Sequence, residues 1–242
     1  MDLPSYNTLQ PKVVLGVAAH PDDLDFSAGG TMAAFAQQGA KVYYLILTDG
    51  GKGSQDRSMK PEKLSELRRA EQRNAGKVIG LADVFFGDYP DGTLQNTMDV
   101  KRDVVRTIRE VKPDVVVTMD PSVLYSTERG FINHPDHRAA GQAALDAVFP
   151  LARDHMSFPE LLAEGYEPHE VRTVLLSNIE RNNYAIDITD TLNKKFQILA
   201  EHVSQVPPNM EGLKERFTER AAQVGTVYGY QYAEPFMRID VH

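Results

Sequence analysis

Short apolar runs alternate along this chain with longer segments in which apolar residues recur at helical spacing. The short runs predict buried strands at 13–19, 41–47, 84–86, 114–119, 171–177 and 184–188. The longer segments predict helices at 29–39, 61–80, 100–111, 134–148, 189–203 and 211–224. Strands that alternate with helices favour βαβ units with right-handed crossovers. We therefore expect an α/β fold, a Rossmann-like three-layer α/β/α sandwich with a mainly parallel sheet.

The pattern gives no reason to divide the chain. No internal repeat, low-complexity tract or linker interrupts it, and 242 residues suit one large α/β domain. We expect residues 1–242 to form a single domain that includes the C-terminal helix at about 211–225.

Charge and hydropathy narrow the possible partners. The formal net charge is −8 and the sequence pI is about 5.4, whereas nucleic acid and anionic membranes call for a basic surface. No apolar run approaches the roughly 18 residues of a membrane span, and the first five residues lack the basic and apolar regions of a signal peptide. We expect a cytoplasmic protein that acts on a small molecule, without nucleic acid and without a membrane span.

Polar clusters follow three of the predicted strands, at 20–23, 48–51 and 120–121. Ligands of open parallel sheets bind outside the carboxyl ends of the strands, so we expect the chemistry there. The chain has no cysteine, which excludes a thiolate nucleophile and leaves His, Asp and Glu to hold any metal ion. The first strand also lacks the Gly-x-Gly-x-x-Gly turn of a dinucleotide-binding module.

The segments 20–23 (His-Pro-Asp-Asp) and 134–137 (His-Pro-Asp-His) carry the strongest chemical signal. An imidazole and a carboxylate suit Zn²⁺, and two imidazoles three residues apart at a helix start share one face. Together the segments offer three protein ligands and leave a fourth position to water, the pattern of a catalytic site.

The same segments contain more ionisable groups than three ligands require. Hydrolysis needs a base that takes a proton from water, and a donor for the developing oxyanion and the leaving nitrogen. Asp22, beside Asp23, suits the base, and one histidine of the second segment suits the donor. Either segment alone is also typical of a turn before a capped helix. Two such turns with the same opening, each after a buried strand, favour a shared site.

These segments resemble the LmbE-like/PIG-L family of N-deacetylases. The diagnostic matches lie at 19–23, 29–31 and 134–138, with weaker matches at 47–50, 68–71, 91–92, 112–116 and 200–205. The similarity thus runs from about Val13 to Gln205. One departure is that Leu24 stands where many members have glutamate, and Asp25 follows it.

The resemblance implies a zinc-dependent hydrolase with a single LmbE-like deacetylase domain. Its metal ligands would be His20, Asp23 and His137, although Fe²⁺ or Co²⁺ would suit the same ligands. Asp22 would be the general base and a protonated His134 would stabilise the oxyanion.

The implied substrate is the acetamide of an N-acetyl amino sugar, such as an N-acetylglucosamine conjugate. The alternative is a zinc-dependent amidase that acts on a different acyl-amide or on a thiol conjugate. Asp136 would orient one imidazole from outside the ligand set. An enzyme of this kind is also expected to be a symmetric homo-oligomer.

Substrate contacts are less sharply indicated. Arg68 resembles a family arginine that reaches sugar hydroxyls or phosphate, or it simply pairs with Glu71 on a helix surface. Asp91 either binds hydroxyls or belongs to a routine Pro-Asp-Gly turn, and Asp49 either supports the site or starts a turn. His202 is interpreted as a packing histidine rather than a site residue.

Two polar loops, 51–60 and 122–133, are long enough to cover the site. In the second loop, Tyr125 and Arg129 are candidate substrate contacts.

Overall fold

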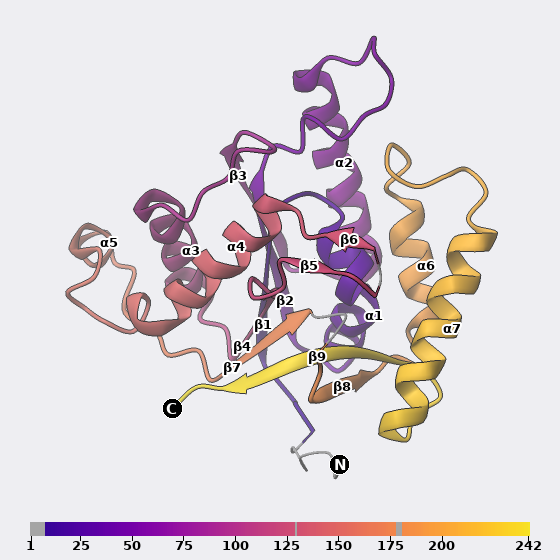
Figure 1. Cartoon of the computed structure of the whole chain (residues 1–242). Coiled ribbons are helices and arrows are strands. Elements are labelled where there is room, and N and C mark those ends of the chain that lie inside the picture. Colours follow the sequence, from indigo (N-terminus) through magenta and orange to yellow (C-terminus); the bar gives the residue numbers. More distant parts are fainter. Residues whose placement is uncertain (1–7, 129, 178–180) are drawn as a thin grey trace.

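The computed structural model of the chain describes residues 8–128, 130–177 and 181–242 (Figure 1). Within these residues seven strands form one sheet in the order β3-β2-β1-β4-β7-β9-β8. The strands are β1 (Val13–Ala18), β2 (Lys41–Thr48), β3 (Asp83–Tyr89), β4 (Val115–Met119), β5 (Tyr125–Ser126), β6 (Phe131–Ile132), β7 (Thr173–Ser177), β8 (Tyr184–Asp187) and β9 (Ala233–Asp240). The helices are α1 (Asp23–Gln37), α2 (Pro61–Ile79), α3 (Met98–Val111), α4 (Pro135–Asp146), η1 (Ala147–Leu151), α5 (Pro159–Ala163), α6 (Leu192–Ala200) and α7 (Glu211–Tyr228).

The expected α/β class and mainly parallel sheet are confirmed. β1, β2, β3, β4 and β7 pair in parallel, whereas β9 runs antiparallel to both β7 and β8. No helix in the described part of the chain is long and apolar enough to cross a membrane.

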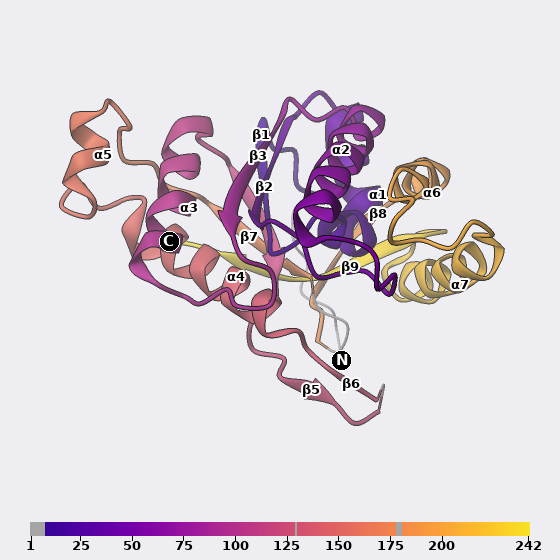
Figure 2. The same cartoon turned by 90° about the horizontal axis from the view of Figure 1, so that it is seen from above.

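Helices cover both faces of the sheet, as the view in Figure 2 shows. On one face, α1 and α2 pack against a core that contains Val14, Tyr44 and Ile46. On the other face, α3 and α4 pack against a core that contains Leu15 and Leu45. Successive residues of a strand point to opposite faces. Because both faces are covered, the central strands are apolar at nearly every position.

Several segments differ from the prediction, among them the short helix α5, which lies where the sequence pattern predicts no element. α1 begins at Asp23, before the expected start at 29, because its polar first turn conceals the helical spacing. β9 falls in a segment that includes the charged residues Glu234, Arg238 and Asp240, which lack the apolar signature of a buried strand. The expected loop at 122–133 contains a β5–β6 hairpin, which projects from the body of the molecule in Figure 2.

The strand order brings together two strand ends at which a site is expected. β1 lies between β2 and β4, so the chain leaves β1 in one direction and returns on the other side to form β4. The carboxyl ends of β1 and β4 are therefore neighbours at a topological switch point. Residues 20–23 follow β1, and the segment that leads to α4 follows β4.

Close packing brings the middle of α4 against the end of β4. A Cβ at Gly141 would overlap the carbonyl oxygen of Met119, so this helix approaches the strand end more closely than another residue would allow. At the far edge of the sheet, α7 contacts β9 and β8. The latter packing supports the proposal that the chain forms a single domain.

Candidate metal centre

Three imidazoles meet at the switch point. His20 lies in the turn after β1, His134 is the N-cap of α4, and His137 lies in the first turn of that helix. The ring centroid of His20 is 4.8 Å from that of His134 and 5.3 Å from that of His137. The ring centroids of His134 and His137 are 5.2 Å apart. One nitrogen from each ring lies within 4.8 Å of the other two. The two His-Pro-Asp segments thus converge, as the sequence predicts.

Asp23 lies between two of these rings. Its Oδ2 atom is 3.3 Å from Nδ1 of His20, and its Oδ1 atom is 3.1 Å from Nε2 of His137. In a tetrahedral site with bonds of about 2.0–2.2 Å, neighbouring donor atoms lie roughly 3.3–3.6 Å apart. The pair of His20 and Asp23, at 3.3 Å, has this spacing, and the pair of His137 and Asp23, at 3.1 Å, is slightly closer.

The other nitrogen of His20 faces two more carboxylates. Its Nε2 atom is 3.1 Å from Asp91 Oδ1 and 3.3 Å from Asp136 Oδ2. Asp136 is fully buried and also accepts backbone hydrogen bonds from Gly92 and Leu94. A metal-ligating histidine usually donates its second N–H to a carboxylate, which fixes the orientation of the ring. The surroundings of His20 have this arrangement, and the excess of carboxylates suits a cation.

The close contacts between imidazoles and carboxylates in this cluster shift the pKa values of its residues. Burial lowers the pKa of His20, but hydrogen bonds from its ring to Asp23 and Asp91 outweigh burial and raise the pKa to about 10. Burial raises the pKa of Asp23, but His137 and His20 hold it well below its ordinary value. Burial raises the pKa of the Asp91 carboxyl. The interaction with His20 outweighs burial and lowers this pKa to about 2. Asp23 and Asp91 are therefore ionised at neutral pH.

Asp22 differs from its neighbour Asp23 in backbone and in charge. It has φ 86° and ψ −26°, a left-handed conformation that an ordinary residue adopts only when its surroundings hold it there. Its backbone N–H donates to Gln72 Oε1 at 2.8 Å, and its carboxylate lies 3.3 Å from Nη2 of Arg68. Burial raises the pKa of the Asp22 carboxyl to about 7, although Arg68 opposes this shift. Such a group both accepts and releases protons near neutral pH.

A buried hydrogen-bond network lies beside Asp22. Asp25 accepts hydrogen bonds from Tyr44 at 3.0 Å and from Gln72 at 2.8 Å, and its Oδ2 atom is 2.7 Å from Nε2 of His202. Gln72 thus joins Asp25 to the backbone of Asp22. His202 is fully buried and its ring lies against the Asp25 carboxylate, as expected of a packing histidine with a satisfied ring nitrogen. In the sequence, the signal for this network was Asp25, an acidic residue that directly follows the departure from the family pattern at Leu24.

His134 is the most exposed of the three imidazoles. Its Nδ1 atom accepts a hydrogen bond from the backbone N–H of Asp136 at 3.2 Å, which leaves Nε2 to carry the proton of a neutral ring. Burial and the neighbouring charges of His20 and His137 lower the pKa of His134. This favours a neutral imidazole with an Nε2–H donor over the protonated form that the family resemblance implies.

The other predicted substrate contacts have protein partners. Arg68 is 4% exposed and donates to the carbonyl oxygens of Gly50 and Pro21, so it braces the turn that carries Asp22. Asp49 accepts hydrogen bonds from the backbone N–H groups of Gly51 and Asp91 and so supports the loop below His20.

In the second loop, Tyr125 is 58% exposed on the β5–β6 hairpin, and Arg129 lies outside the described residues. Phe131 of that hairpin, which the sequence did not single out, lines the cavity next to the site instead.

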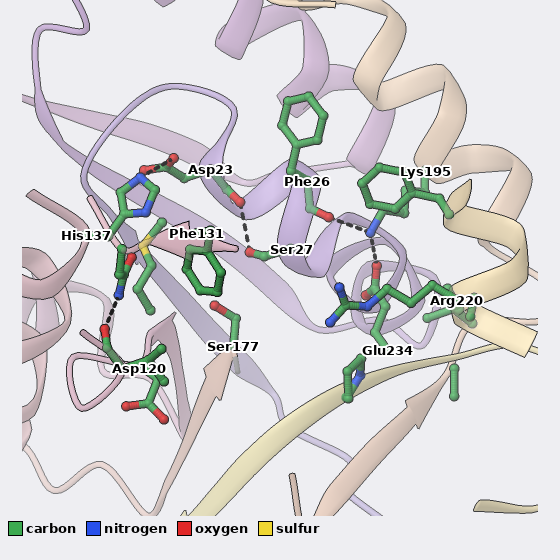
Figure 3. Close-up of a pocket in the computed structure, with 18 of the residues that line it drawn as sticks. Asp23, Phe26, Ser27, Asp120, Phe131, His137, Ser177, Lys195, Arg220 and Glu234 are labelled. Carbon is green, nitrogen blue, oxygen red and sulfur yellow. Dashed lines mark hydrogen bonds and ion pairs between the residues drawn. The ribbon is translucent and has the colours of Figure 1, made fainter. Parts of the chain in front are cut away.

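A cavity of about 470 Å³ opens beside the metal centre. Figure 3 shows Asp23 and His137 at one end of it and Lys195, Arg220 and Glu234 at the other. Its wall combines residues of α1, the segment after β4, α6, α7 and β9. The cavity therefore joins the predicted chemistry to the C-terminal part of the chain.

Comparison with known proteins identifies relatives of this arrangement. A family model described as PIG-L, GlcNAc-PI de-N-acetylase, matches residues 15–148, a range that contains both His-Pro-Asp segments. A diacetylchitobiose deacetylase of Thermococcus kodakarensis is 31% identical over 224 residues, which are 92% of this chain and 81% of that protein.

Solved structures agree with this relationship. An N,N'-diacetylchitobiose deacetylase from Pyrococcus horikoshii matches with a TM-score of 0.86 and 28% identity, over 95% of this chain and 84% of the other. GalB, a 4-carboxy-2-hydroxymuconate hydratase from Pseudomonas putida, matches with a TM-score of 0.78 and 23% identity, over 96% of this chain and 97% of the other. The GalB match establishes the fold alone, so the activity has to be argued from the site.

Proposed function

Since the chain belongs to the PIG-L, LmbE-like family of GlcNAc-PI de-N-acetylases, we propose that it hydrolyses the acetamide of an N-acetylglucosamine conjugate and releases acetate. The observation that carries this proposal is the cluster of His20, His134 and His137, in which the Asp23 carboxylate lies 3.3 Å from His20 and 3.1 Å from His137. The likeness to two diacetylchitobiose deacetylases supports an amino sugar as the substrate.

We propose that His20, Asp23 and His137 would hold a divalent ion; imidazole and carboxylate ligands suit Zn²⁺, and Fe²⁺ or Co²⁺ would suit the same residues. When bound, such an ion lowers the pKa of coordinated water and polarises an amide carbonyl. Asp91 and Asp136 keep the His20 ring in place through its Nε2 atom.

The remaining side chains supply the proton transfers. Asp22 accepts the proton of the attacking water, and its pKa of about 7 suits a base at neutral pH. The Nε2–H of His134 donates to the oxygen that becomes negative when the amide carbon turns tetrahedral. Collapse of that intermediate breaks the C–N bond, the amine takes up the proton, and acetate leaves. Arg68 and Gln72 hold Asp22 in its left-handed conformation.

Acetate release tests the activity directly. The purified protein should release acetate from N-acetylglucosamine or from N,N'-diacetylchitobiose, measured by an enzyme-coupled acetate assay. Both substrates contain the acetamide that the proposal requires. Failure to release acetate from either of them, or from a panel of N-acetylglucosamine glycosides, by a metal-loaded sample would refute the proposed activity.

Removing one ligand should remove the metal. We expect His20→Ala to purify with a small fraction of the metal bound by the wild type and to lose activity, because two remaining ligands hold a divalent ion poorly. The measurement is metal content per chain after dialysis against a dilute zinc buffer. His155→Ala is the matched control, since His155 is exposed and lies outside the cluster. Full metal content in His20→Ala would contradict the ligand assignment.

A further inference from the structure

We propose that Asp25 is a positioning residue of the hydrolysis: it fixes the direction of the Gln72 side-chain amide and, through that amide, the place of the Asp22 carboxylate. The inference rests on the proposed function, in which Asp22 accepts the proton of the attacking water. Asp25 lies in the first turn of α1, three positions after Asp22, and is fully buried.

The turn that carries Asp22 needs support from outside itself. Asp22 is the N-cap of α1, yet its φ of 86° is left-handed and its side chain makes no capping hydrogen bond. An N-cap aspartate ordinarily has an extended backbone and turns its carboxylate back onto the helix N–H groups. The left-handed conformation costs about 1–3 kcal/mol and persists only when neighbouring groups hold it. Here it keeps the carboxylate off the helix and beside Arg68, at 3.3 Å.

The side chain of Gln72 supplies part of that support, and only one direction of its amide can do so. Its Oε1 atom accepts a hydrogen bond from the backbone N–H of Asp22, and its Nε2 atom donates to Oδ2 of Asp25, each at 2.8 Å. With the amide reversed, Nε2 would face another donor and Oε1 would face a carboxylate oxygen. Asp25 therefore determines which end of the Gln72 amide meets the turn.

Asp25 is itself fixed by two further donors. Tyr44 of β2 donates to Oδ1 at 3.0 Å, and Nε2 of His202, in the segment after α6, lies 2.7 Å from Oδ2. Asp25, Gln72, Tyr44 and His202 are each at most 1% exposed. Such a buried network is rigid, because a broken bond would leave a polar group without water as a substitute partner. The network thus ties the Asp22 turn to α2, to β2 and to the segment after α6.

Removing the polar ends of Gln72 tests the connection to the base. Gln72→Met keeps the length of the side chain and removes both hydrogen bonds. We expect kcat to fall about 10–100-fold, since a displacement of about 1 Å costs up to roughly 10² in rate. KM should stay within about twofold of the wild type, because the substrate contacts remain. The metal content per chain should not change.

A second background shows whether Gln72 acts through Asp22. In Asp22→Asn, the further change Gln72→Met should lower kcat by less than about twofold, because the carboxylate that Gln72 positions is already gone. A purely structural role would lower kcat by the same factor in both backgrounds, and that result would overturn the proposal. An unchanged kcat in folded Gln72→Met, a rise in KM alone, or loss of the metal would also overturn it.

Two substitutions of Asp25 separate its acceptor atoms from its shape. Asp25→Leu removes both oxygens and should reproduce the loss of kcat of Gln72→Met. Asp25→Asn keeps an acceptor for Gln72 Nε2 and should retain most of the wild-type kcat. Equal losses in these two variants would contradict the role of Asp25. Should Asp25→Leu fail to fold, the comparison of Asp25→Asn with Gln72→Met decides the question, because a loss in Asp25→Asn as large as in Gln72→Met contradicts the role as well.

Thr173→Val is the matched control for the loss of a buried hydrogen bond. The Thr173 hydroxyl donates to Asp240 Oδ1 at 2.9 Å at the start of β7, the opposite end of that strand from the site. This variant should lose stability and keep the wild-type kcat. Wild-type kcat in Gln72→Met refutes only this inference, whereas a metal-loaded wild-type protein that releases no acetate refutes the proposed function.

Discussion

Replacing Asp22 with asparagine should lower kcat by about 10²–10⁴ while the protein keeps its metal. The loss corresponds to removal of a general base, which contributes about that much to a hydrolysis. Asparagine preserves the size of the side chain and is one of the few residues that tolerate a left-handed backbone, so the turn at φ 86° should persist. Acetate release under saturating substrate gives kcat, and elemental analysis of the same sample gives the metal content.

The matched control for this variant is Asp88→Asn. Asp88 is exposed on β3 and pairs with Arg69 away from the site, so neither kcat nor metal content should change. Near-normal turnover by Asp22→Asn would rule out Asp22 as the base. Loss of the metal from Asp22→Asn would instead indicate that this carboxylate is a ligand.

Breaking the buried ion pair in the cavity wall should strongly destabilise the fold. Lys195→Met leaves Glu234 charged and only 3% exposed, with the backbone N–H groups of Gly30 and Thr31 as its remaining partners. Removing one member of a buried pair costs about 3–5 kcal/mol. Urea unfolding followed by circular dichroism should therefore show a free energy of unfolding lower by that amount.

A second substitution separates the cost of an unpaired buried charge from the cost of a changed side-chain shape. Lys195→Met combined with Glu234→Gln removes the stranded charge and keeps an amide oxygen for the backbone donors, so it should regain part of the lost stability. Lys214→Met, at an exposed position of α7, should stay within about 0.5 kcal/mol of the wild type. If Lys195→Met were as stable as Lys214→Met, the pair would not hold α6 to β9.

The central strands were predictable because local sequence determines them. β1, β2 and β4 are buried on both faces, and this burial requires the continuous apolar runs that the sequence displays. β9 escaped prediction because its place depends on pairing with β7 and β8 rather than on its own composition. The β5–β6 hairpin has two-residue strands, which are too short to give a periodic signal.

The site, like the fold, was predictable only where local sequence determines it. The meeting of the two His-Pro-Asp segments was predictable from the rule that strand ends gather at one edge of the sheet. The contacts of His20 with Asp91, and of Asp25 with His202, join elements far apart in sequence and leave no local pattern. The roles given to the individual site residues, and a homo-oligomeric state, stay predictions.

The meeting of the two segments also affects the chain as a whole. His20 and Asp136 are 116 positions apart in the sequence, and Gly141 fixes the second segment by its contact with the Met119 backbone. An ion bound by residues of both segments would connect two parts of the chain that are far apart in sequence. It would bind only when both halves of the sheet are assembled. Chelation should therefore loosen the whole molecule as well as stop its chemistry, and the melting temperature should climb with free zinc.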